Sequence, residues 1–164
     1  MPGCGKSYFG ALIAQKLNRT FVDTDKLVVS EYHQQATCRE IVLRDGAQFF
    51  RRLESKVVQE LANIQNSVVA IGGGTLCTPE NIPILRNLGW MIYLKVSPQI
   101  LLERLKTQSS LPAYLDKADI EGSFEALLTQ RLPLYEQHCH GCVDVHSEDV
   151  LQVLCSWGEK PHGE

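Results

Sequence analysis

The stretch Met1-Pro2-Gly3-Cys4-Gly5-Lys6-Ser7 opens the chain and leads directly into a helical pattern. It matches the end of the pattern G-x-x-x-x-G-K-[ST], in which glycines let backbone N–H groups surround phosphates, lysine reaches the outer phosphates and a hydroxyl binds Mg²⁺. N–H groups at a helix N-terminus favour an anion, and Lys6 adds a mobile positive charge. The stretch therefore predicts a nucleotide-phosphate site, formed by Gly3, Cys4, Gly5, Lys6, Ser7 and Tyr8.

The residues after the loop support this interpretation. Phe9, Leu12, Ile13 and Leu17 recur at nearly helical spacing, as the motif requires. The alternative is that Gly-x-Gly-Lys-Ser is only a loop that opens a helix, and the rest of the chain has to decide between the two. In the full pattern a further glycine and a strand precede the loop. Both would lie before Met1, so we expect a chain that is shortened at its N-terminus.

Length and charge limit the class of protein. A chain of 164 residues is long enough for one domain with a substantial core and too short to suggest two. The net charge of −3 argues against general nucleic-acid binding, whereas a nucleotide site needs only a local positive cluster. No apolar run approaches the roughly 20 residues that span a bilayer, and no signal peptide is visible. We expect an enzyme that binds no nucleic acid and no membrane, and we take it to be a monomer.

The cysteines favour a reducing, cytoplasmic setting. The six cysteines show no regular spacing, and one lies inside the phosphate loop. The stretch His138-Cys139-His140-Gly141-Cys142 holds four potential zinc ligands. No second ligand pair follows at zinc-finger spacing, so a turn leading into a strand is the favoured interpretation and a zinc site the alternative.

Strand and helix patterns alternate along the chain. Strands are expected at 21–25, 68–71, 90–96 and 143–145. Helices are expected at 26–32, 39–43, 49–64, from Thr78-Pro79 to Gly89, and at 98–106, 123–135 and 147–156. Residues 107–121 lose the apolar periodicity and occupy the place of a mobile lid in nucleotide kinases. The alternation predicts a parallel sheet covered on both faces, five-stranded if one more strand comes first.

Two further motifs are predicted to lie near the phosphate loop. Asp23 and Asp25 are placed at the C-terminal end of the 21–25 strand, on one side of it. Ligands of open α/β sheets bind beyond the carboxyl ends of the strands, so these carboxylates should share the crevice of the loop. Gly72-Gly73-Gly74 follows the next strand and permits close backbone approach to a ligand. A flexible strand-to-helix turn is the alternative.

These residues, in this order and approximate spacing, resemble shikimate kinases: Gly3-x-Gly5-Lys6-Ser7, Asp23-Thr24-Asp25, Phe50-Arg51-Arg52-x-Glu54, Gly72-Gly73-Gly74 and Arg131-x-Pro133-Leu134-Tyr135. Phosphate loops are common, but the five motifs together are hard to place elsewhere. The resemblance covers residues 1–135. It implies an α/β P-loop NTPase-type three-layer sandwich with a parallel sheet of order 2-3-1-4-5, whose first strand is missing from this chain. It also implies one domain over residues 1–164, with the lid at about 107–121.

The resemblance implies transfer of the γ-phosphoryl group of ATP to the 3-hydroxyl of shikimate, in the route to aromatic amino acids. Such transfers depend on in-line positioning and charge stabilisation. Lys6 would hold the β- and γ-phosphates, Ser7 would ligate Mg²⁺ and Asp23 would act near the metal. Asp25 would accept hydrogen bonds from substrate hydroxyls and take or orient the 3-hydroxyl proton. Arg104 would stack on adenine.

The same resemblance assigns the substrate side of the site. Arg51 and Arg131 would bind the shikimate carboxylate, for which the planar guanidinium is suited. Taken alone, either arginine could be an ordinary surface charge on a helix. Gly73 and Gly74 would offer backbone N–H groups to the substrate, and Glu54 would bond to the substrate or steady Arg51.

The lid departs from the family pattern. The family has arginine just before a proline there, whereas this chain has Leu111 before Pro112. Lys106 and Lys117 flank the segment and could supply a positive charge. Two alternatives therefore stay open: a catalytically impaired, shikimate-kinase-like binding protein, and another small-molecule P-loop kinase, for instance of gluconate type. The latter would also show the phosphate loop and the lid, but it has no evident need for Asp23-Thr24-Asp25, Phe50-Arg51-Arg52-x-Glu54 and Arg131-x-Pro133-Leu134-Tyr135.

Overall fold

The computed structural model describes residues 1–32, 35–108 and 110–160. The helices are α1 (Lys6–Lys16), α2 (Thr24–Glu31), α3 (Cys38–Asp45), α4 (Ala47–Glu60), α5 (Asn81–Leu88), α6 (Pro98–Lys106), α7 (Ile120–His138) and α8 (Val150–Glu159). Two 3₁₀ turns follow α4 and β2: η1 (Leu61–Asn63) and η2 (Thr75–Cys77). The strands are β1 (Thr20–Asp23), β2 (Ser67–Ala70), β3 (Ile92–Lys95) and β4 (Gly141–Asp144).

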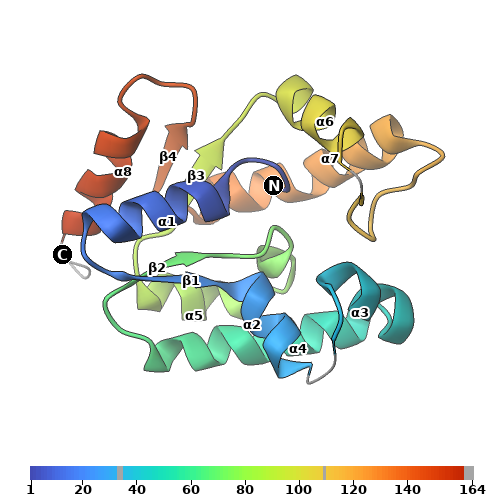
Figure 1. Cartoon of the computed structure of the whole chain (residues 1–164), viewed down its shortest axis with the longest axis horizontal. Helices are drawn as coiled ribbons and strands as arrows, with labels where there is room; N and C mark the ends of the chain where they lie inside the picture. The colour runs from blue at the N-terminus through green and yellow to red at the C-terminus, as the bar shows by residue number, and fades with distance from the viewer. Residues whose placement is uncertain (33–34, 109, 161–164) are drawn as a thin grey trace.

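The strands form two parallel pairs. β1 pairs with β2, with Phe21 opposite Val68, and β3 pairs with β4, with Leu94 opposite Val143. The order 2-3-1-4-5 counts the missing strand as the first, and it places strands 2 and 3 on one side of that strand and strands 4 and 5 on the other. The pair β1–β2 corresponds to strands 2 and 3, and the pair β3–β4 corresponds to strands 4 and 5 (Figure 1). Within the described ranges no strand lies between them. Val68 of β2 is accordingly half-buried, although the sequence predicted a strand buried on both faces.

Helix α1 joins the two strand pairs on one face. An apolar cluster contains Ile13 of α1, Val143 of β4 and Leu154 of α8, and both Val68 of β2 and Ile92 of β3 pack against it. Burial of this apolar surface holds the pairs together without backbone hydrogen bonds between them. Figure 1 shows β1 and β2 between α1 on one side and α4 and α5 on the other. The predicted three-layer α/β arrangement is confirmed.

Two other apolar clusters build the remainder of the fold. The larger one joins the strands to α4, α5, α6 and α7 through residues such as Val22, Val58, Leu85, Leu105 and Leu127. The smaller one packs α2, α3 and α4 against one another and forms the arm at the lower right of Figure 1. This arm carries the predicted substrate arginine of α4 beside the strand ends.

The first strand ends earlier than predicted, and this changes the position of Asp25. Asp23 is the last residue of β1 and also the N-cap of α2, because its Oδ1 accepts a hydrogen bond from the Asp25 backbone N–H at 3.1 Å. Asp25 therefore lies in the first turn of a helix. The prediction that both aspartates alternate along one strand was wrong, because the shorter strand leaves the second carboxylate to be placed by helical geometry.

The helix predicted to start at Pro79, with Thr78 as its N-cap, starts at Asn81 instead. Residues 75–77 form η2, and the Asn81 backbone N–H donates to Thr78 O at 3.0 Å. The buried Asn81 side chain also donates to Thr75 O at 3.1 Å. Thr78 and Pro79, which were predicted to start the helix, therefore lie before it. The predicted end at Gly89 is confirmed.

The boundaries of the last two helices also differ from the predictions. Helix α7 starts at Ile120, three residues early, because Asp119 caps it by accepting from the Gly122 N–H at 2.9 Å. Helix α8 starts at Val150 rather than 147, because Ser147 turns back to bond with Asp144 O. The irregular segment before α7 is confirmed for the described residues between 107 and 119. No helix in the described ranges is both long and apolar enough to cross a bilayer.

Candidate active site

The phosphate loop has the backbone that its glycines predict. Gly3 and Gly5 have φ of 74° and 91°, a left-handed conformation that costs glycine little. Gly5 precedes α1 and provides no side-chain cap, so the first N–H groups of the helix are left for a ligand. Lys6 Nζ donates to Met1 O at 3.0 Å, and Arg104 Nη1 donates to Gly3 O at 2.7 Å. The predicted nucleotide residues Lys6 and Arg104 therefore meet at one loop.

The remaining predicted loop residues are Ser7, Cys4 and Tyr8. Ser7 Oγ donates to Asp23 Oδ2 at 2.7 Å, which brings the two predicted metal ligands together. Cys4 is buried beneath the loop. Tyr8 is exposed, and its ring lies edge-on to Phe9 with the ring centroids 5.2 Å apart.

Asp25 lies beside the first glycine of the Gly72-Gly73-Gly74 turn. A Cβ at Gly72 would come within 2.9 Å of Asp25 Oδ1 and 2.8 Å of Glu54 Oε1, so a side chain there would collide with both carboxylates. Burial raises the pKa of Asp25 above its ordinary value, the charge of Lys6 opposes this rise and the charge of Asp23 adds to it. A carboxylate with a raised pKa is a suitable proton acceptor near neutral pH.

Glu54 holds Arg51 in place. The buried Glu54 accepts from Arg51 Nη1 at 2.5 Å through Oε2 and from Thr75 Oγ1 at 2.7 Å through Oε1. Both of its oxygens are thus engaged, which favours the predicted role of steadying Arg51 over a direct bond to a substrate. Gly74 packs against the same guanidinium so closely that an added Cβ would overlap it.

Arg131 is a buried cation with unused hydrogen-bond donors. Only 2% of the residue is exposed, and within the described residues its Nε and Nη1 have no hydrogen-bond partner. A Cβ at Gly73 would lie 3.3 Å from Nη1, and the Tyr135 hydroxyl donates to Gly73 O at 2.5 Å. Leaving buried charged donors unpaired is expensive, so this pair of N–H groups points to an anion that binds there. A carboxylate fits the planar guanidinium edge.

The glycine turn therefore gathers residues from four parts of the sequence around one position. The predicted substrate residues lie against its three glycines, and the phosphate loop adjoins through Met1, whose carbonyl carbon is 3.8 Å from a Cβ at Gly73. The family model of shikimate kinase matches residues 2–157. This chain belongs to the shikimate kinase family.

Relatives in the shikimate kinase family span most of this chain. The chain is 40% identical to the shikimate kinase of Synechococcus sp. (strain CC9605), covering 98% of this chain and 82% of that protein. It is 37% identical to that of Symbiobacterium thermophilum, covering 96% and 94%. The solved shikimate kinase from Acinetobacter baumannii in complex with shikimate superposes with a TM-score of 0.82 at 28% identity, covering 94% and 84%.

Three residues near this shikimate kinase site were missed by the sequence reasoning. Thr24 Oγ1 accepts from the Gly72 N–H at 2.8 Å, and Thr75 supports Glu54. Tyr114 presents its ring to Arg131, with the guanidinium carbon 4.4 Å from the ring centroid. Thr24 lies inside the motif Asp23-Thr24-Asp25 and Thr75 follows the three glycines, so their small hydroxyl side chains were a usable signal. Tyr114 was marked only by being aromatic in a polar segment.

The zinc alternative finds no support in this member of the shikimate kinase family. Among the described residues no group of three or more His, Cys, Asp or Glu is placed to hold a metal ion. His140 Nδ1 instead accepts the Met91 N–H at 3.0 Å, and β4 begins at the next residue, Gly141. The interpretation as a turn leading into a strand is confirmed.

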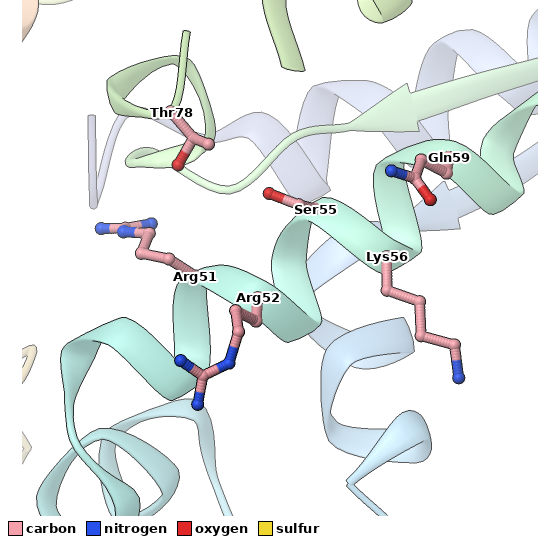
Figure 2. Close-up of a pocket in the computed structure, with 6 residues that line it drawn as sticks. All are labelled: Arg51, Arg52, Ser55, Lys56, Gln59 and Thr78. Atoms are coloured by element: carbon pink, nitrogen blue, oxygen red, sulfur yellow. The ribbon is translucent and has the colours of Figure 1, made fainter. Parts of the chain in front are cut away.

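A pocket of about 300 Å³ lies between α4 and Thr78. Six residues line it: Arg51, Arg52, Ser55, Lys56, Gln59 and Thr78. Figure 2 shows Arg52 and Lys56 pointing away from Thr78, and Lys56 forms ion pairs with Glu31 and Glu60. Of the lining residues only Arg51 belongs to the predicted site, so this pocket and the predicted site share one residue.

Proposed function

We propose that this chain transfers the γ-phosphoryl group of ATP to the 3-hydroxyl of shikimate, a step in aromatic amino acid biosynthesis. The observation that carries the proposal is Arg131, a buried guanidinium with Nε and Nη1 unpartnered in the described structure. It lies at the same glycine turn as Asp25, and the phosphate loop adjoins this turn through Met1. A substrate with a carboxylate at one end and hydroxyls at the other fits this arrangement of charge.

In this proposal two arginines recognise the carboxylate and the glycine turn lines the space between them. Arg131 supplies its free Nε and Nη1 edge, and Arg51, held by Glu54, supplies a second guanidinium next to Gly74. The bidentate geometry of guanidinium fixes the orientation of the ring as well as its charge. A Cβ at Gly74 would overlap the Arg51 guanidinium, and a Cβ at Gly73 would lie 3.3 Å from Arg131 Nη1, which is tighter than an ordinary contact.

Asp25 is the proposed group that orients and accepts the 3-hydroxyl proton. It lies against Gly72, and the charges of Lys6 and Arg51 both act on it. Lys6 Nζ is bonded to the Met1 carbonyl oxygen, a neutral partner that the lysine can exchange for phosphate oxygens at small loss. Positioning of this kind supplies most of the acceleration in phosphoryl transfer.

The residues present fit a magnesium ion. Ser7 Oγ and Asp23 Oδ2 are hard oxygen donors 2.7 Å apart at the end of the phosphate loop. Mg²⁺ takes few protein ligands and completes its shell with water and phosphate oxygens, so this pair is sufficient. When bound, the ion neutralises charge on the β- and γ-phosphates. Arg104, bonded to Gly3 O, is the proposed adenine-side residue.

The proposal includes the organisation expected from the sequence. Residues 1–164 would form one domain with a lid at about 107–121, acting as a monomer without nucleic-acid or membrane partners. All six cysteines are free thiols. This is the state expected of a cytoplasmic protein, and it supports the proposed cytoplasmic setting.

A coupled assay of ADP release tests the proposal. The 164-residue chain is incubated with ATP and Mg²⁺, with shikimate, with gluconate, or with neither. We expect ADP release that requires shikimate. ADP release with gluconate but not with shikimate would favour a gluconate-type kinase. Calorimetric binding of shikimate without ADP release would favour a catalytically impaired binding protein, the alternative suggested by Leu111 in place of the lid arginine.

A further inference from the structure

The segment at residues 110–119 crosses the site at the level of Arg131 and is fixed to its surroundings by its own contacts. Arg39 Nη1 of α3 donates to Leu111 O at 2.7 Å. Leu111 and Leu115 are buried, with 7% and 5% of each exposed. Figure 1 shows the chain between α6 and α7 passing toward α3. The segment is thus anchored by a hydrogen bond from the Arg39 side chain to its backbone and by two buried leucines.

Tyr114 lies between Leu111 and Leu115 in the sequence, but it is not buried as they are. It is 43% exposed, although its ring contacts the buried Arg131 with the guanidinium carbon 4.4 Å from the ring centroid. Since the leucines already bury the segment, the tyrosine is not needed as a core residue. Its ring lies over the guanidinium, and its hydroxyl also interacts with the Arg131 side chain, while Nε and Nη1 of Arg131 keep no partner in the described structure.

The face and the edge of a guanidinium can be used at the same time. An aromatic ring attracts the cation through its face, and a carboxylate bonds to N–H groups in the guanidinium plane. A ring on the face therefore fixes the plane and leaves the free edge in a constant direction. Without the ring, rotation about the arginine side-chain bonds would spread that direction and weaken a bidentate bond.

We propose that Tyr114 is a positioning residue of the carboxylate subsite, whose ring holds the Arg131 guanidinium so that its free edge faces the substrate. This rests on the proposed function, because it takes shikimate as the source of the carboxylate. It makes Tyr114 a determinant of specificity: it favours acceptors that carry a planar anion over acceptors that carry only hydroxyls.

Two variants separate the ring from the hydroxyl. Tyr114→Leu keeps apolar bulk and removes the aromatic face, whereas Tyr114→Phe keeps the face. We expect Tyr114→Leu to raise KM for shikimate about fivefold to thirtyfold, the range of a cation–π contact, with kcat within about twofold and KM for ATP unchanged. Tyr114→Phe should restore the shikimate KM to within about twofold of the original chain.

A substrate without the anion provides the matched control. With shikimate methyl ester the carboxylate contact is absent, so the original chain and Tyr114→Leu should bind it equally weakly. A KM for shikimate that Tyr114→Leu leaves unchanged would overturn the inference. So would equal losses for shikimate, the ester and ATP together with a lowered thermal midpoint, since these indicate a purely structural role.

Calorimetric titration of shikimate keeps this test separate from the test of function. If the original chain binds shikimate but releases no ADP, the proposed activity fails, and Tyr114 is still tested by the dissociation constants of the same three proteins. If the original chain neither binds shikimate nor phosphorylates it, both proposals fall.

Discussion

The Ser7 hydroxyl donates a 2.7 Å hydrogen bond to Asp23 Oδ2 and so ties the start of α1 to the end of β1. The other oxygen of Asp23 caps α2 by accepting the Asp25 N–H. One carboxylate therefore sets the distance between the proposed metal position and the proposed proton acceptor, because both neighbours bond to it.

Asp23→Asn tests the metal part of this arrangement. Asparagine can still cap α2 through its side-chain oxygen, so the fold should be kept, but the negative charge beside Ser7 is lost. We expect half-maximal activity to require about 10 to 100 times more Mg²⁺, the usual cost of disturbing the surroundings of a metal. Titrations of kcat against Mg²⁺ at saturating ATP measure it. An unchanged magnesium curve would remove Asp23 from the metal site.

Arg131→Lys tests recognition of the carboxylate. Lysine keeps the charge but lacks the planar pair of donors, so KM for shikimate should rise about tenfold or more while KM for ATP stays within about twofold. Arg52→Lys is the matched control, because Arg52 lies in the same sequence motif as Arg51 but is exposed and packs over Phe49. Equal losses for shikimate and ATP in Arg131→Lys would mean that Arg131 serves the fold.

Asp25→Asn should lower activity and raise stability together. The pKa of Asp25 is raised in the folded chain, chiefly by burial, so the folded state binds this proton more tightly than the unfolded state. The resulting stability is present at low pH and is lost as the pH rises through the raised pKa, so at neutral pH the charged carboxylate destabilises the fold. Removing its charge should increase the thermal midpoint at pH 7.

The activity of the same variant should fall by about 10²- to 10⁴-fold in kcat, the range for loss of a general base. In the original chain, kcat/KM should fall on acidification at a pH above the ordinary aspartate pKa of about 3.9. This acid limb should be absent from the residual activity of Asp25→Asn. A variant that is fully active, or one that retains the limb, would assign the proton to another group.

The replacement of the family's lid arginine by Leu111 leads to a prediction of increased activity. An arginine delivered to the transferring phosphoryl group can accelerate transfer by several powers of ten, so Leu111→Arg should raise kcat at least about tenfold with little change in KM for ATP. The Arg39 bond should persist, since it uses the Leu111 backbone oxygen. Leu111→Met, which keeps the buried volume, is the control and should leave kcat unchanged.

Lys117 is the residue that we expect to substitute partly for that arginine. Lys106 is held by Glu121 at 2.7 Å and by Glu103 at 3.9 Å, whereas Lys117 is exposed and forms no ion pair with the described residues. Lys117→Ala should therefore lower kcat markedly, and Lys106→Ala should not. The opposite ranking of the two lysines would show that the cation comes from the α6 end of the segment.

The sequence predicted which residues meet at the phosphate loop and the glycine turn because its motifs carry their own geometry. Gly3 and Gly5 required positive φ, and the glycines after β2 required close neighbours, which proved to be Asp25, Glu54 and the arginines. The parallel pairing followed from the alternation of elements, and the strand order that includes both observed pairs followed from the family resemblance. These features depend on short stretches of chain or on topology, and both can be recognised in a sequence.

What was mispredicted depends on contacts between distant residues. A strand of four residues is too short for its period to decide whether Asp25 belongs to it, and the Asp23 cap decided the matter. Thr78 and Pro79 look like a helix start, but the buried Asn81 bond to Thr75 O displaces the start. The role proposed for Tyr114 depends on its contact with Arg131 of α7, which no local sequence pattern indicates.

The most direct test of the central claim is the identity of the phosphorylated product. The 164-residue chain, ATP, Mg²⁺ and shikimate are incubated together, and phosphorus-31 NMR correlated to the ring protons determines which oxygen carries phosphate. We predict one ester, on the 3-oxygen, formed in equal amount to ADP. Phosphate on another oxygen, or shikimate recovered unchanged by a chain that binds it, would contradict the account.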